Sequence, residues 1–246
     1  MVDLPARPTS PPPSWRLSDA ALALGLLLLG YVLLLGALIG GAVAFGVSTR
    51  DDPAGALLTA LVTLLLEAWI GGVVWGLARR RGLTGVDLGL DRPPDVRRVA
   101  YAVGGAYGAL VAYGLLLAAI ERVAGADLGA LKEGNGLPDL PGDSNLVWLI
   151  LGVSVVACAP LSEELFFRGL LFRAVAGRFG LAAGVAGSAL LFSAFHLNVS
   201  VVLPFLVIGL ILAWAYHASG SLWTSVVAHA IVNTVSFVLT LAGVGP

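Results

Sequence analysis

The chain has 246 residues, of which 58% are hydrophobic and only 12% are charged, with a formal net charge of -1 and a mean hydropathy of +0.94. An ordinary soluble domain carries about 25% charged residues, so this composition predicts an integral membrane protein. The basic residues form no patch with interleaved aromatic side chains, which excludes a nucleic-acid partner. The single cysteine, Cys158, excludes an intrachain disulfide and a cysteine-rich metal site.

Residues 1–16 are polar and rich in proline, and they predict a disordered cytoplasmic tail. The apolar run that follows, 17–47, is too long for a signal-peptide core of about 7–15 residues, so it predicts a retained anchor helix. Six more apolar runs approach the length of about 20 residues that spans hydrocarbon. They lie at 54–78, 99–120, 146–175, 181–198, 200–218 and 221–243. The prediction is an all-α polytopic bundle of about seven transmembrane helices, in one domain at 17–246.

The basic residues are divided unevenly between the polar links. The link 79–98 contains six arginines, whereas 121–145 contains only Arg122 and Lys132 among five acidic residues. The positive-inside rule therefore places 79–98 and the N-terminus in the cytoplasm. With seven spans the C-terminus lies outside. We expect a multi-pass protein of a cell membrane, and the excess of Ala, Gly and Leu with arginine over lysine favours a bacterial inner (plasma) membrane.

Two adjacent acids and an arginine lie inside the apolar run 146–175. An ionised carboxylate in hydrocarbon costs about 2.5 to more than 10 kcal/mol, so such residues pair, face a watery cavity or do chemistry. On a helix Glu164 and Arg168 share a face, whereas Glu163 projects about 100° away from Glu164. This geometry predicts an ion pair that leaves Glu163 available to accept a proton. The alternative is that both acids have a structural role only, as bonding partners of neighbouring helices. Pro160 is expected to kink this helix and free a backbone carbonyl for a polar partner.

Further polar residues fall at a similar predicted depth. Glu163 and His196 are both 15 residues from the predicted turn between their helices, and His229 and Asn233 share one face of the last span. We predict that they form one active site. A histidine and a glutamate polarise a water either directly or through a divalent metal such as Zn²⁺, for which His196, His229 and Glu163 are the candidate ligands. An amide or imidazole N–H is suited to stabilise the resulting oxyanion.

Glu67, in the second apolar run, has no basic residue within four positions. We predict that it either makes a structural hydrogen bond between helices or lines the same cavity as the other polar residues.

Three short motifs occur in the second half of the chain: Glu-Glu-x-x-x-Arg (Glu163, Glu164, Arg168), Phe-x-x-x-His (Phe192, His196) and His-x-x-x-Asn (His229, Asn233). In their order they resemble the motifs of the CPBP family, also called ABI. This family contains CAAX proteases and bacteriocin-processing enzymes, including the type II CAAX prenyl endopeptidases. The resemblance covers 146–243, which is the predicted catalytic part.

The resemblance implies an intramembrane endopeptidase whose site opens towards the cytoplasm. It implies that Glu163 activates the hydrolytic water with His196 beside it, supported by the ion pair of the first motif. His229 and Asn233 then stabilise the oxyanion. Metal-dependent and metal-free, glutamate-dependent mechanisms are both described for this family. The implied substrate is a prenylated or unmodified peptide or protein at the membrane, cleaved near its cytoplasmic face.

Two other classes of function stay open. One is a non-catalytic membrane protein that binds a peptide or confers bacteriocin immunity. The other is a small-solute transporter in which Glu67, Glu163 and His196 relay protons. Transporters often contain paired internal repeats and broken helices in matching halves. The sequence shows neither feature, which disfavours the transporter.

Overall fold

The computed structural model describes residues 14–49, 52–132 and 144–243, so the predicted tail lies almost wholly outside the described residues. Every regular element in these ranges is helical, which confirms the all-α prediction. Six helical runs are long and apolar enough to cross a membrane. They are α1 (Leu17–Phe45), α2 (Pro53–Arg81), α3 (Val96–Ala124), the run Asn145–Phe179, the run Val199–Ser219 and α10 (Leu222–Leu241).

The remaining predicted span, 181–198, is the 15-residue helix α8 (Leu181–Phe195). At a rise of 1.5 Å per residue it is about 22 Å long, which is shorter than the hydrocarbon core of a bilayer. The chain then turns and continues through the 3₁₀-helix η3 (Val199–Val201) into α9 (Val202–Ser219). The predicted bundle of about seven helices is therefore present, with six full-length runs and one shorter helix among the described residues.

The run Asn145–Phe179 is continuous but changes its helical register twice. It consists of α5 (Asn145–Gly152), the π-helix η1 (Val153–Cys158), α6 (Ala159–Glu164), the π-helix η2 (Leu165–Phe172) and α7 (Arg173–Phe179). π-Helical turns are rare and are often found at functional sites. Here they flank the short α6, which ends with the two adjacent glutamates.

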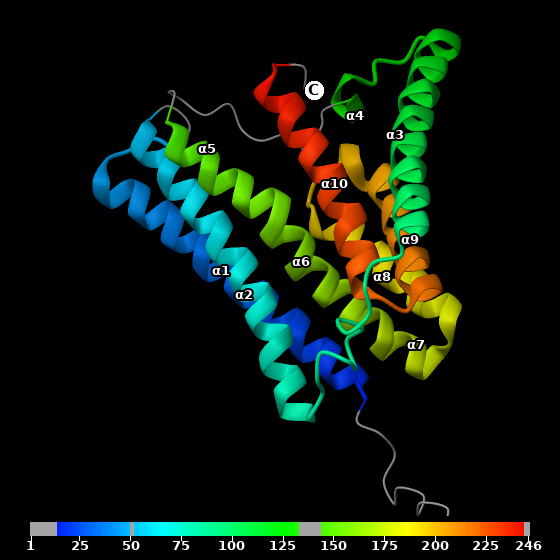
Figure 1. The fold of residues 1–246 in the computed structure, drawn as a ribbon. Coiled ribbons are helices and arrows are strands. Elements are labelled where there is room, and N and C mark those ends of the chain that lie inside the picture. Colours follow the sequence, from blue (N-terminus) through cyan, green and yellow to red (C-terminus); the bar gives the residue numbers. More distant parts are fainter. Residues whose placement is uncertain (1–13, 50–51, 133–143, 244–246) are drawn as a thin grey trace, which may run out of the picture.

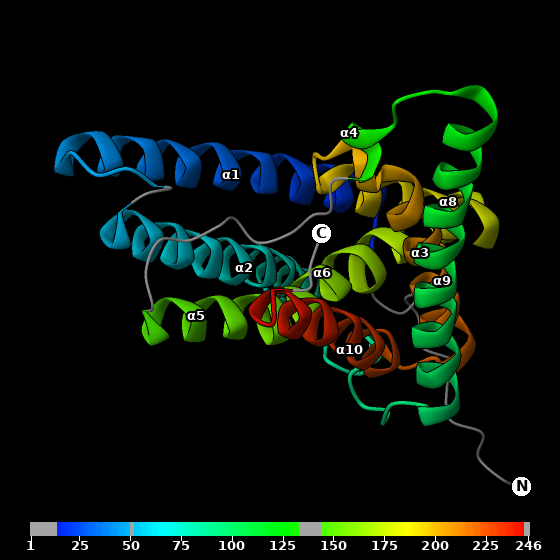
Figure 2. The same ribbon diagram turned by 90° about the horizontal axis from the view of Figure 1, so that it is seen from above.

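The helices form two groups with the site between them. Seen from above, α1, α2 and α5 lie beside one another, and α3, α8 and α9 form a second group, while α6 and α10 pass between the two (Figure 2). α8 and α9 approach closely, since a Cβ atom built on Gly209 would lie 3.0 Å from the Ala189 Cα. Small residues of this kind permit tight helix contacts in a membrane. A single short helix, α4 (Gly129–Lys132), lies outside this bundle.

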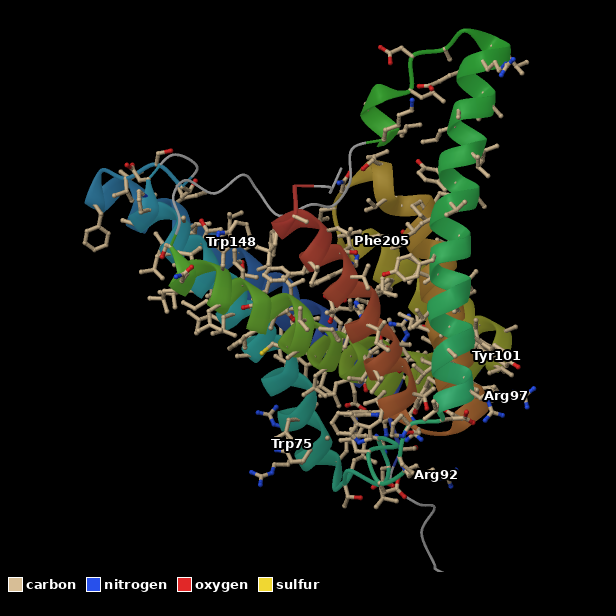
Figure 3. The ribbon with its side chains drawn as sticks, turned by 45° about the horizontal axis from the view of Figure 1, so that its top comes forward. Trp75, Arg92, Arg97, Tyr101, Trp148 and Phe205 are labelled. Atoms are coloured by element: carbon tan, nitrogen blue, oxygen red, sulfur yellow. The ribbon has the colours of Figure 1, made fainter. Side chains whose placement is uncertain are left out.

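One end of the bundle gathers most of the arginines. Hydrogen bonds close this end: Arg81 binds Asp19 at 2.6 Å, the Leu222 amide donates to the Gly89 carbonyl at 2.8 Å, and the Ser221 hydroxyl donates to the Arg92 carbonyl at 2.7 Å. We call it the arginine end; it holds the end of α2, the link to α3, the start of α3 and α7, and Figure 3 labels Arg92 and Arg97 there (Figures 1 and 3). By sequence these segments carry Arg79, Arg80, Arg81, Arg92, Arg97, Arg98, Arg173 and Arg178. The opposite end, which we call the distal end, holds the start of α5, the end of α10 and α4 (Figure 1).

The loop at the arginine end is ordered by a carboxylate. Asp87 accepts hydrogen bonds from the Thr84 backbone N–H at 2.7 Å and from its hydroxyl at 2.8 Å. These hydrogen bonds, the backbone one first, lower the pKa of Asp87 because they stabilise its ionised form. Asp87 is half-buried and its partners are three residues away, so this interaction shapes the loop more than it stabilises the fold.

The outer faces of the bundle are strongly apolar. Large side chains such as Leu28, Val32 and Leu115 are 65%, 63% and 67% exposed. A continuous apolar surface of this kind is unfavourable in water and favourable against lipid tails. Together with the spanning helices it shows a multi-pass membrane protein.

Candidate active site

A cavity of about 360 Å³ lies between the two helix groups. Its walls come from α2, the run containing η1 and α6, the end of α8, α9 and α10. The polar lining side chains are Glu67, Glu163, His196, His229, Asn233, Ser236 and Thr240, and the apolar ones include Val155, Phe192, Phe205, Ile208, Val232 and Phe237. The structure therefore brings four of the six predicted site residues to one cavity, together with Glu67.

The other two predicted residues form an ion pair behind the cavity wall. Arg168 Nη1 donates to Glu164 Oε1 at 2.6 Å, and both side chains are fully buried. Arg168 Nη2 also donates to the Gly209 carbonyl at 2.9 Å, and the guanidinium lies 4.7 Å from the centre of the Phe192 ring. The predicted i, i+4 pair is present. Its enclosure matters because a buried charge is tolerated only when it is paired and hydrogen-bonded.

His229 connects the ion pair to the cavity. Its Nδ1 lies 3.1 Å from Glu164 Oε1, the same oxygen that Arg168 binds. An ionised carboxylate only accepts hydrogen bonds, so Nδ1 carries the hydrogen. Nε2 then accepts a hydrogen bond in the neutral ring and donates one only in the imidazolium form. Glu164 thus fixes the orientation of His229, a link between the first and third motifs that their spacing does not reveal.

His196 is oriented by its own helix. It follows the last residue of α8, and its Nδ1 lies 2.8 Å from the Phe192 carbonyl, one turn earlier. Since a carbonyl only accepts, Nδ1 carries the hydrogen, which leaves Nε2 of the neutral ring as an acceptor. The ring packs edge-on against Phe205 with centroids 4.5 Å apart. His196 is therefore held rigidly with an acceptor nitrogen, the arrangement needed to bind a water hydrogen.

Glu163 faces the cavity, whereas Glu164 belongs to the ion pair behind it. Glu163 lines the cavity, is 8% exposed, and its Oε2 has no hydrogen-bond partner within the part of the chain that the structure describes. No described cation forms a salt bridge with it. The division predicted from the sequence, one paired glutamate and one available glutamate, is the arrangement that the structure contains.

Glu67 makes a hydrogen bond and also lines the cavity, so both interpretations of this residue apply. The Ser162 hydroxyl donates to Glu67 Oε2 and also lies 3.2 Å from the Ala159 carbonyl. Ser162 directly precedes Glu163, so this contact ties α2 to the turn that presents the available glutamate. The sequence analysis did not predict this contact of Ser162 with Glu67; the only available signal was that Ser162 directly precedes Glu163.

Asn233 shares the cavity with His229, and its side chain also binds a neighbouring helix, which the spacing of the two residues does not reveal. Its side-chain Nδ2 donates to the Val155 carbonyl at 2.9 Å. In the π-helical register each backbone N–H donates to the carbonyl five residues earlier, as the Ala159 N–H does to the Ser154 carbonyl. The next carbonyl, that of Val155, would need the N–H of residue 160, but Pro160 has none. The expected free carbonyl is therefore satisfied by Asn233. One amide hydrogen of Asn233 is used for this bond, and the second stays available at the cavity.

The candidate metal ligands do not converge. Within 14–49, 52–132 and 144–243, no group of three His, Cys, Asp or Glu residues is placed to hold a metal ion. His196 and His229 direct their Nδ1 atoms to a carbonyl and to Glu164, and Glu163 lies on a different helix from both. The structure therefore does not gather His196, His229 and Glu163 into a metal centre; this ligand set stays a prediction, and we derive no chemical step through a metal.

Fold and cavity together define a polytopic helical membrane protein with a glutamate, two histidines and an asparagine at one internal site. Comparison with known proteins finds a family whose model resembles this part of the chain. Residues 144–235 match the model of the type II CAAX prenyl endopeptidase Rce1-like family. The matched segment contains all three motifs, so the resemblance found in the sequence is confirmed.

The chain also resembles one curated protein. Over 142 residues the chain is 25% identical to the UPF0177 protein YxdF of Lactococcus lactis subsp. lactis (strain IL1403), an alignment that covers 56% of this chain and 75% of that protein. No solved structure matches the chain significantly.

Proposed function

We propose that this chain is an intramembrane endopeptidase that hydrolyses a peptide bond of a membrane-associated peptide or protein. The observation that carries the proposal is the contrast between the two adjacent glutamates. Glu164 is neutralised by Arg168 and bound to His229, whereas Glu163 faces the cavity without a counter-charge. A free carboxylate and a rigidly held imidazole that line the same cavity are suited to activate water together. The Rce1-like family match supports the class of reaction.

The proposed mechanism uses groups on the cavity wall. Glu163 takes a proton from a water whose second hydrogen is held by His196 Nε2, and the water oxygen attacks the carbonyl carbon of the scissile peptide bond. The resulting oxyanion accepts the second N–H of Asn233, and it accepts Nε2–H of His229 when that ring is an imidazolium. As the C–N bond breaks, Glu163 returns its proton to the leaving amine. The ion pair holds His229 and does not touch the reacting atoms.

The proposed location follows from the charge asymmetry. We propose a cell membrane, the bacterial inner membrane, with the arginine end and the N-terminus in the cytoplasm, because arginine-rich links stay on that side. The bilayer and a peptide substrate are then the partners of the protein.

The first test is cleavage of a mixed peptide library by the detergent-purified protein, with Glu163→Gln compared to wild type. A general base contributes about 10²–10⁴-fold to the rate, so the variant should lose at least about 100-fold in turnover while keeping its thermal stability. Glu121→Gln, which removes an exposed ion pair with Lys132, is the matched control and should cleave as wild type does. Wild-type turnover by Glu163→Gln would contradict the mechanism.

A chelator arm separates the two catalytic types. The metal-free mechanism predicts unchanged cleavage in the presence of a chelator, whereas loss of cleavage with recovery on added Zn²⁺ would require a metal and a rearranged ligand set. Peptide binding by both proteins without cleavage by either would favour the alternative of a non-catalytic peptide-binding or bacteriocin-immunity protein.

A further inference from the structure

A second cavity, which we call the arginine-end cavity, lies at the arginine end of the bundle. Its volume is about 660 Å³, within the range of about 300–1,000 Å³ that is usual for small-molecule sites. Three segments form its walls: 14–17 at the start of α1, the loop after α2, and α7 with the last residue of η2 (Figure 1). It shares no lining residue with the candidate active site, so it needs an explanation of its own.

Three arginines line this cavity. Arg16 and Arg178 are exposed, and neither forms a salt bridge within the part of the chain that the structure describes. Arg173 is half-buried, and its Nε donates to the Tyr216 hydroxyl at 2.6 Å, which fixes the guanidinium and leaves its Nη groups for another acceptor. Asp87, whose carboxylate is hydrogen-bonded within its own loop, offsets one of the three charges. The lining therefore carries an excess of positive charge that no described acidic residue neutralises.

The rest of the lining is largely apolar. Trp15, Leu83 and Phe172 belong to it and are 7%, 8% and 6% exposed. Tryptophan is enriched at membrane–water interfaces, and Trp15 lies two residues before the spanning helix α1 begins. Exposed apolar side chains follow on both flanking helices, with Leu22 of α1 45% exposed and Phe179 of α7 61% exposed. Cationic and apolar groups together, at the end of spanning helices, suit an anionic amphiphile better than a free anion.

We propose that the arginine-end cavity binds the phosphate group of an anionic phospholipid through Arg16, Arg173 and Arg178, with the acyl chains against the outer face of α1. A guanidinium group matches two phosphate oxygens at once, which is why arginine is preferred at phosphate sites. Bound lipid connects the start of α1 to α7, two segments that pack together and lie far apart in the sequence. It should stabilise the fold, because a ligand that binds only the folded state shifts the unfolding equilibrium. Such binding requires neither peptidase activity nor a particular orientation in the membrane.

The test is lipid binding by the detergent-purified protein, measured by native mass spectrometry and by thermal unfolding followed through tryptophan fluorescence. Phosphatidylglycerol, phosphatidylcholine and inorganic phosphate are added separately. Phosphatidylglycerol should bind saturably and raise the unfolding temperature, whereas phosphatidylcholine, whose headgroup has no net charge, should bind at least tenfold more weakly. Equal binding of the two lipids would overturn the proposal. An equal effect of inorganic phosphate at the same concentration would also overturn it, because the ligand would then be a free anion.

A pair of double variants locates the binding site. Arg16→Gln with Arg178→Gln removes the two exposed charges of the cavity and should weaken phosphatidylglycerol binding at least tenfold. Arg79→Gln with Arg80→Gln, at two exposed positions of the same end that do not line the cavity, is the matched control and should bind within twofold of wild type. Without added lipid both double variants should unfold at the wild-type temperature, which shows that they are folded. Wild-type affinity in the first double variant, or an equal loss of affinity in the control, would refute the site.

Discussion

Replacement of Arg168 by leucine tests how the site is held together. The guanidinium is fully buried and makes two hydrogen bonds, to Glu164 and to the Gly209 carbonyl. Without it, Glu164 is a fully buried carboxylate that lacks its cationic partner and keeps hydrogen bonds to neutral groups such as His229. Breaking a buried pair by removing one member costs about 3–5 kcal/mol, because the remaining charge is uncompensated. We expect Arg168→Leu to lower the free energy of unfolding by about 4 kcal/mol.

The double variant sharpens this prediction. Glu164→Leu alone should cost a similar amount, since it leaves the arginine unpaired. Arg168→Leu with Glu164→Leu removes both charges and should cost no more than either single change, because an apolar pair replaces the ion pair. The coupling energy between the two positions is then about 3 kcal/mol or more.

The measurement is unfolding of the purified protein by titration with a denaturing detergent, followed by tryptophan fluorescence and circular dichroism. Arg178→Leu, at the exposed end of α7, is the matched control and should change the free energy of unfolding by less than about 0.5 kcal/mol. Additive effects of the two single changes, or an Arg168→Leu protein as stable as wild type, would refute the reasoning.

Substitutions at two further positions, Leu197 and Glu67, test the groups around the proposed catalytic residues. Leu197 follows His196, is 73% exposed and has φ 51°, a left-handed conformation that costs a non-glycine residue about 1–2 kcal/mol. Leu197→Gly should therefore raise the free energy of unfolding by about 0.5–1 kcal/mol with cleavage retained; a loss of stability would contradict this. Glu67→Gln keeps an acceptor for the Ser162 hydroxyl and should cleave within about threefold of wild type, whereas Glu67→Leu removes the bond and should cost about 1–2 kcal/mol in unfolding experiments. If Glu67→Gln were as damaging to cleavage as Glu67→Leu with stability preserved, the charge of Glu67 would be required.

Much of the fold follows from patterns within short segments. Apolar runs of about 20 residues identify spanning helices because lipid forces each segment to satisfy its own backbone hydrogen bonds. The same local logic predicts the Glu164–Arg168 pair, since residues four apart meet on any helix. Even the carbonyl freed near Pro160 follows from the chemistry of proline alone.

Other features depend on contacts between distant segments. The length of α8 could not be predicted, because the apolar pattern continues past Phe195 while the helix ends there. Asn233 was assigned to the substrate from its spacing to His229, but its amide binds Val155, 78 residues earlier in the chain. The two candidate roles of Glu67 could not be separated until the structure placed α2 beside Ser162.

By itself, the sequence identified the polar residues that line the cavity or form the buried ion pair, because charged and hydrogen-bonding groups are costly in hydrocarbon and therefore few. Only the tertiary structure decided how these residues are used. It decided that Glu164 orients His229, that Asn233 binds the Val155 carbonyl, and that Glu163 and His196 line one cavity. These outcomes depend on how α2, α6, α8 and α10 pack, and packing is fixed by the shapes of side chains that meet across helices and not by the spacing within any one of them.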